Sequence, residues 1–237
     1  MAEATITETE TGVGQGRSWL GRDGLLVACA ALMGLTLYLI FFWVPTEVNL
    51  GVSQRIFYFH VPLGWLGMIS IVVVAVASLM HLATGKEKWD SLAYSSAELG
   101  VVFATLIIVT GATWAKPVWG VWWTWDAKLT TTLILWFIYV GYLMLRSYSP
   151  KGSQGARYGA VVALMGAIDA PIIYLATIWW RGAHPENNVP KDLDGRMALT
   201  FLVSLIAFTV LYVYILVERL SLRRAEAALD ELYQRAA

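Results

Sequence analysis

The sequence has 237 residues, of which 58% are hydrophobic and only 14% are charged, whereas a soluble domain usually has about half apolar and about a quarter charged residues. This composition, with a mean hydropathy of +0.60, excludes an ordinary soluble domain and predicts an integral membrane protein. The formal net charge is zero, so the charge balance gives no support to nucleic acid as a partner. A single cysteine, Cys29, excludes an internal disulfide.

The chain begins with a polar stretch and continues with six apolar runs. Residues 1–18 lack the basic start and apolar core of a signal peptide, and we predict a disordered tail there. Each later run is close to the ~20 residues that a helix needs to cross a bilayer; they are Leu25–Val44, Leu63–Ala83, Leu92–Ala112, Leu129–Leu145, Tyr158–Ile178 and Met197–Val217. The expected fold is an all-α bundle of six transmembrane helices over residues 19–220. Residues 221–237 mix charges with Leu at helical spacing and predict a solvated helical tail, with a partner-docking helix as the alternative.

The loop charges predict the orientation of this bundle. An even number of spans places both termini on one side, where eleven of the Lys and Arg residues fall, against six on the other side. The positive-inside rule therefore predicts that both termini are cytoplasmic. Three loops then lie outside: Pro45–Val61, Trp114–Lys128 and Trp179–Gly195.

The segment WGVWWTWD, Trp119–Asp126, carries four of the chain's 12 Trp residues. If the segment is helical, Trp119, Trp122 and Trp123 share a face while Trp125 points elsewhere. Such a cluster forms a wide apolar platform with N–H donors at its rim, which suits a planar macrocycle with a charged edge. The alternative is an aromatic belt at the lipid headgroups. Asp126 is expected to cap the following helix, and this does not exclude a role in the site.

Two of the three histidines flank this segment on the predicted outer side. His60 precedes Pro62, which suits the first turn of the second helix, and His184 follows the fifth span. A lone interfacial histidine is more often a hydrogen-bonded surface group than a ligand, but two on the same side of a Trp platform suggest axial ligands of haem iron, for which neutral imidazole is common. His81 falls near the cytoplasmic end of its span and is assigned no role. Zinc is not favoured because no short-interval ligand set is present, and without a C-x-x-C-H motif any haem is expected to be held non-covalently.

Two acidic residues lie within predicted spans, where an ionisable group is costly. Asp169 is close to Pro171 and is expected to satisfy backbone groups freed at a kink. Glu98 is expected to face the interior of the bundle.

Three segments, RIFYFHVPLGW, TGATWAKPVWGVWWTWDAKLT and DAPIIYLATIWWRGAH, resemble the CcmC family of cytochrome c biogenesis proteins, which carry a WWD-type motif. The resemblance covers the second to fifth spans and their outer loops. It implies that His60 and His184 are axial ligands of haem b, and that a haem-binding motif is formed by Trp119, Gly120, Trp122, Trp123, Trp125 and Asp126. It also implies a place in the bacterial inner membrane and delivery of haem to the chaperone CcmE, in a complex with CcmA, CcmB and CcmD.

The chain departs from the expected family pattern at Lys128, where we expect Arg. An ammonium group pairs with a carboxylate as a point charge and not as a bidentate fork. Arg55, Lys128 and Arg181 are the candidates to meet the haem propionates. Two alternative functions are a haem-b electron-transfer subunit, which usually holds its haem inside the bundle, and a structural permease subunit without haem.

The predicted orientation is tested by reporter fusions. Reporters placed after Gly120 or Ala183 should report an extracytoplasmic location, and reporters placed after Lys86 or Gly152 a cytoplasmic one, because the basic loops stay inside. The reverse pattern at either pair would contradict the assignment of the three loops.

Overall fold

The computed structural model describes residues 13–149, 152–180, 182, 184 and 193–236. It contains six long α-helices: α1 (Val13–Tyr38), α2 (Phe57–Thr84), α3 (Glu87–Trp119), α4 (Ala127–Tyr148), α5 (Ser153–Trp179) and α6 (Gly195–Ala236). Each contains a segment long and apolar enough to cross a membrane, and the described part of the chain has no strand. The prediction of an all-α, six-span protein is confirmed.

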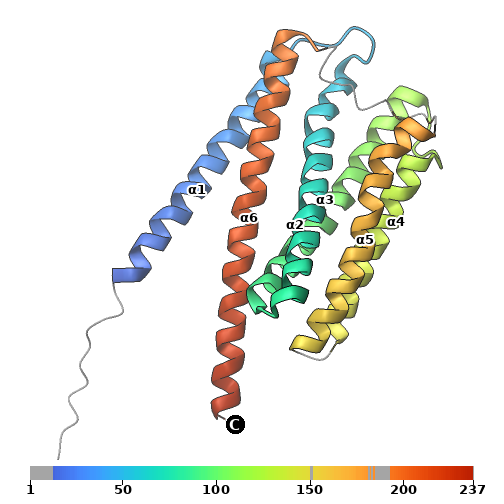
Figure 1. The fold of residues 1–237 in the computed structure, drawn as a ribbon. Helices are drawn as coiled ribbons and strands as arrows, with labels where there is room; N and C mark the ends of the chain where they lie inside the picture. The colour runs from blue at the N-terminus through green and yellow to red at the C-terminus, as the bar shows by residue number, and fades with distance from the viewer. Residues whose placement is uncertain (1–12, 150–151, 181, 183, 185–192, 237) are drawn as a thin grey trace, which may run out of the picture.

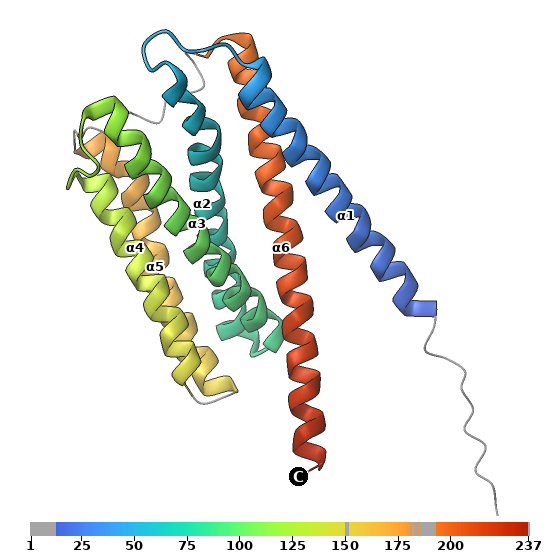
Figure 2. The ribbon, with the colours of Figure 1, turned by 180° about the vertical axis from the view of Figure 1, so that it is seen from behind.

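The helices form one layered bundle (Figures 1 and 2). α2 and α3 lie in the middle and make the most extensive contact with each other, α4 and α5 pack on one side of them, and α6 lies on the other side with α1 against it. α1 slants away from α6 toward its N-terminal end. The connections α2–α3 and α4–α5 are at the opposite end of the bundle from the Trp-rich segment, as predicted from the order of the six spans.

The terminal helices extend beyond the predicted apolar runs. α1 begins at Val13, inside the stretch 1–18 that was predicted as a tail, while residues 1–12 lie outside the described part. α6 runs without a break from Gly195 to Ala236, so residues 221–236 continue the sixth span as a helix. Both extensions follow from helix cooperativity, because each residue added to an existing helix gains a hydrogen bond without a new nucleation cost.

The entry into α2 differs from the prediction. A 3-10 turn, η2 (Val52–Ile56), leads directly into α2 at Phe57, several residues before the predicted start at Leu63. His60 therefore lies in the first turn as expected, whereas Pro62 lies inside the helix and not in its first turn. Pro62 removes the N–H that would bond to the carbonyl of Tyr58, so the cost falls within the first two turns of α2 and not in its middle.

Small residues let α2 and α3 approach closely. A Cβ added to Gly100 would meet the Cβ of Ser70 at 3.2 Å. The Ser96 hydroxyl lies 3.0 Å from the Ser70 carbonyl and 2.8 Å from the Tyr212 hydroxyl of α6. Close backbones and hydroxyl hydrogen bonds replace the hydrophobic effect that is missing between helices in lipid. This seam fixes the rotation of α2 against α3.

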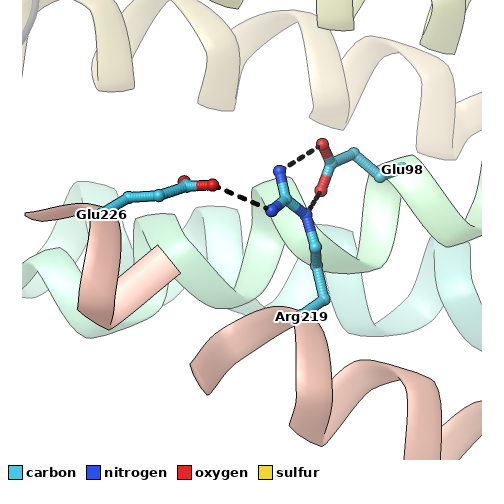
Figure 3. Close-up of polar contacts among 3 residues, drawn as sticks. All are labelled: Glu98, Arg219 and Glu226. Carbon is cyan, nitrogen blue, oxygen red and sulfur yellow. Dashed lines mark hydrogen bonds and ion pairs between the residues drawn. The ribbon is translucent and has the colours of Figure 1, made fainter. Parts of the chain in front are cut away.

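Glu98 of α3 pairs with Arg219 of α6 (Figure 3). Arg219 donates from Nε to Oε2 at 2.6 Å and from Nη2 to Oε1 at 2.9 Å. Its remaining Nη1 lies 3.4 Å from the more exposed Glu226. A bidentate pair of this kind is strong and directional. Glu98 therefore points toward α6, and its partner lies beyond the last predicted span.

Replacing Glu98 by Gln should lower the stability of the folded protein. The change removes one charge-assisted bidentate pair that is about a quarter exposed, and we expect a loss of about 1 kcal/mol, measured by thermal or denaturant unfolding in detergent. Glu226→Gln is the matched control, because Glu226 makes only the long and exposed contact. Equal effects of the two changes would contradict a role for the bidentate pair.

Candidate functional site

The imidazole of His60 is held between α2 and α3. Its Nδ1 lies 2.9 Å from the Oγ1 of Thr110. Its ring lies edge-on to Trp114, with 5.8 Å between the ring centroids. A Cβ added to Gly111 would meet the Cε1 of His60 at 3.1 Å, so a glycine is needed for this close approach.

The hydrogen bonds of Thr110 assign the tautomer of His60. The Thr110 hydroxyl has one proton and donates it to the Leu106 carbonyl at 2.7 Å. With the hydroxyl proton on that carbonyl, the oxygen accepts from His60, and this arrangement places the imidazole proton on Nδ1. The proton on Nδ1 leaves Nε2 with a free lone pair, which is the form of imidazole that binds a metal.

His184 lies close to His60 although the two are far apart in the chain. The charges of His184 and of Lys128 both act on the His60 ring. Lys128 belongs to the first turn of α4, and His184 follows α5. Lys128 and His184 line one cleft and lie within electrostatic range of His60, so three different elements place charged or titratable groups in one region.

The start of α4 is joined to the segment that carries His184. Asp126 caps α4, as predicted, by accepting a hydrogen bond from the Leu129 N–H at 2.9 Å, and its other oxygen accepts from the Thr124 hydroxyl at 3.0 Å. A Cβ added to Gly182 would lie 3.0 Å from the Cβ of Asp126. The absence of a side chain at Gly182 thus lets this segment rest on the cap.

A small cleft lies between the start of α4 and the segment that carries His184. It is lined by Asp126, Ala127, Lys128, Ala176, Trp180, Gly182 and His184. Its volume of about 10 Å³ is enough for about one water molecule and far too small to enclose a macrocycle. A large flat ligand would have to lie on the outer surface of this end of the bundle.

The Trp-rich segment is not a continuous helix, so the conditional arrangement of Trp119, Trp122 and Trp123 on one helical face is wrong. α3 ends at Trp119, and Gly120 closes it with a φ of 77°, a backbone conformation that favours glycine. The residues after it form an irregular loop up to Asp126. Trp123 and Trp125 pack edge to face, with 5.7 Å between their ring centroids.

The loop nevertheless exposes a large aromatic surface. Trp119, Trp122 and Trp125 are exposed, the last by 76%, as are Trp179 and Trp180 at the end of α5. The indole N–H groups of Trp114 and Trp123 are buried without an acceptor among the described residues. This end of the bundle therefore combines exposed indole faces with N–H donors for which the described residues supply no acceptor.

Arg55 lies at a different place from the histidines. It lines a second cavity, of about 350 Å³, together with Phe41, Val52, Ser53, Ile56 and Phe59, and it is not among the charges that act on His60. Arg181 lies outside the described residues. Of the three cations predicted to meet propionates, the structure places Lys128 beside the histidines.

The predictions for His81 and Asp169 have different outcomes. His81 is buried at the far end of α2, with its Nδ1 3.2 Å from the Lys86 carbonyl, and contributes nothing to the site. Asp169 is buried in α5, and its Oδ2 has no hydrogen-bond partner among the described residues. The expectation that this oxygen satisfies backbone groups at a kink is therefore not met.

Sequence reasoning missed four residues that shape the site: Thr110, Gly111, Trp114 and Gly182. A signal was present for three of them, because the run TGATW interrupts the apolar third span with small and polar residues. Such residues in a span often mark a close helix contact.

Six helices able to cross a membrane, with two histidines and exposed indoles at one end of the bundle, define a polytopic membrane protein whose candidate site lies at the helix ends. Comparison with known proteins identifies the group. Residues 18–234 match the family model described as Heme exporter protein C, and the chain belongs to this family.

Similar proteins with this name come from several bacteria. The one from Bradyrhizobium diazoefficiens is 37% identical over 173 residues, which are 71% of this chain and 66% of that protein. The one from Haemophilus influenzae is 33% identical over 179 residues, 74% of this chain and 73% of that protein. The one from Escherichia coli K12 is 32% identical over 188 residues, 78% of this chain and 77% of that protein.

Asp126→Ala should destabilise the site end of the protein. Loss of the cap costs about 1 kcal/mol and also removes the carboxyl group that lies against Gly182, while the Cβ contact stays. We expect a lower unfolding midpoint in detergent and faster proteolysis between α5 and α6. Asp126→Asn keeps an acceptor oxygen and should restore most of both properties. Failure of Asn to do better than Ala would contradict the capping role.

Proposed function

We propose that this chain binds haem non-covalently where His60 and His184 meet, and delivers it to the haem chaperone CcmE for maturation of c-type cytochromes. The observation that carries the proposal is the proximity of the two imidazoles in a chain that belongs to the Heme exporter protein C family. The relatives are named for export, which favours a transport role over catalysis. In this proposal haem is the transported substrate and not a resident cofactor.

The form of His60 supports iron ligation. With Nδ1 hydrogen-bonded to Thr110, Nε2 is the nitrogen available to the iron, and ligand histidines typically hold their other ring nitrogen in a fixed hydrogen bond. His184 would supply the opposite axial nitrogen. Both histidines lie at the helix ends and not in the middle of the bundle, which argues against the alternative of an electron-transfer subunit with haem between helices.

The residues around the two histidines suit the porphyrin ring and its propionates. The exposed indoles of Trp119, Trp122 and Trp125 offer apolar faces for the porphyrin. Lys128, with its charge close to His60, would meet a propionate.

The charge bias of the loops supports a site on the extracytoplasmic face of the bacterial inner membrane. Haem bound at the surface of the bundle is accessible to a chaperone from that side. The family resemblance supports a complex with CcmA, CcmB and CcmD as further subunits of the export system.

The histidines provide the test. His60→Ala or His184→Ala removes one axial bond and leaves the indole surface in place, so we expect five-coordinate or differently ligated haem and loss of transfer to CcmE. Absorption and electron paramagnetic resonance spectra of the purified protein give the spin and ligation state. Imidazole at millimolar concentration is small enough to fill the vacated position and should restore the low-spin spectrum of each variant.

His81→Ala, at the other end of α2, is the control and should keep the parental spectrum. An unaltered low-spin spectrum in both site variants would show that the iron ligands lie elsewhere.

Thr110→Val should weaken haem retention without removing a ligand. The isosteric change deletes the acceptor that orients His60, and loss of such a partner typically lowers affinity by about ten- to a hundredfold. Haem titration of the purified protein measures the effect. Thr113→Val is the matched control, since its exposed hydroxyl bonds only to carbonyls of its own helix. Equal retention in both variants would contradict the orienting role.

A further inference from the structure

A second polar cluster lies at the end of the bundle opposite His60. Arg146 near the end of α4 and Arg223 in α6 both lie over the ring of Tyr94 in α3, with guanidinium carbons 5.7 and 4.1 Å from the ring centroid. Arg146 also donates from Nη2 to Asp90 Oδ2 at 2.7 Å. The charges of all three ionised groups act on the buried Tyr142 hydroxyl, so the groups share one small region.

The donors of this cluster outnumber its acceptors. Nε and Nη1 of Arg146 and Nε of Arg223 are buried and have no hydrogen-bond partner among the described residues. Two guanidinium groups face a single carboxylate, Asp90, which leaves an excess of one positive charge. Buried charged donors without an acceptor are costly, so this arrangement favours an anion that supplies the missing oxygens.

The cluster is also held in place before any ligand arrives. A Cβ on Gly159 of α5 would lie 2.5 Å from the Cδ of Arg146, so the stem of this arginine fits tightly against α5. Arg223 is fixed by its stacking on Tyr94. Four helices, α3 to α6, therefore contribute to one preformed group of donors, which lowers the entropy cost of binding.

We propose that Arg146 and Arg223 bind the phosphate group of an anionic phospholipid headgroup. Guanidinium donors match phosphate oxygens in geometry and charge. Arg146 lies two residues before the end of α4 and Asp90 three residues after the start of α3, which places the cluster at the depth where headgroups lie. Inorganic phosphate offers the same oxyanion from solution, and the test separates the two sources. The proposal does not depend on haem binding.

The test uses the intact protein in detergent micelles doped with either phosphatidylglycerol or phosphatidylcholine, examined by native mass spectrometry. The parent should retain phosphatidylglycerol in preference to the zwitterionic lipid, because the site carries excess positive charge. Arg223→Gln should lower this retention by about tenfold, the effect of losing one charge-assisted contact. Arg146→Gln should act in the same direction. Arg224→Gln is the matched control, since it removes the same charge from an exposed neighbour and should leave retention unchanged.

A parallel arm titrates the lipid-free protein with inorganic phosphate and follows the ³¹P resonance. Phosphate binding that is lost in Arg223→Gln, without retention of phosphatidylglycerol, would establish the oxyanion site and reject the lipid as its source. Equal behaviour of Arg223→Gln and Arg224→Gln toward both probes, or equal retention of the two lipids by the parent, would overturn the proposal. The cluster would then serve only to tie α3, α4 and α6 together.

Discussion

The hydrocarbon core of the bilayer imposes the constraint on which this structure depends. It offers no hydrogen-bond partner to an open backbone group, so the chain crosses only as helices and irregular segments are confined to the ends. Six crossings place three connecting segments at one end. Residues that carry chemistry then come from these segments and from the first turns beside them, as His60, Lys128 and His184 do. The site lies at the membrane boundary for this reason.

Close packing between α2 and α3 extends from the middle of the bundle to the end where His60 lies. Gly100 and Ser70 set the approach of the two helices, and Gly111 lies about three helical turns further along the same face of α3. The seam therefore continues from the serine contacts to the imidazole of His60, which fits against Gly111 and bonds to Thr110. His60, the proposed ligand, is positioned by helix packing, whereas the segment that carries His184 is placed by the contact of Gly182 with the cap of α4.

The two ends of the bundle use polar groups differently. At the far end, Arg219 and Glu98 satisfy each other across α6 and α3, and Arg22 of α1 pairs with Glu218 of α6. These pairs attach the outer helices α1 and α6 to the rest. At the histidine end, the buried indole N–H groups of Trp114 and Trp123 have no acceptor among the described residues. The far end thus holds the outer helices by ion pairs, whereas the histidine end gathers aromatic rings and imidazoles.

Residue type and order alone determined the six spans, the shared end of the bundle at which the Trp segment and two histidines gather, and the cap at Asp126, because apolar run length and capping chemistry are local properties. Only the tertiary structure decided that Thr110 orients His60, that Lys128 and not Arg55 lies beside the histidines, and that Glu98 pairs with Arg219. Each of these is a contact between elements distant in the chain. Such contacts depend on how far each helix is rotated and shifted against its neighbour, and many rotations bury an apolar face equally well in lipid.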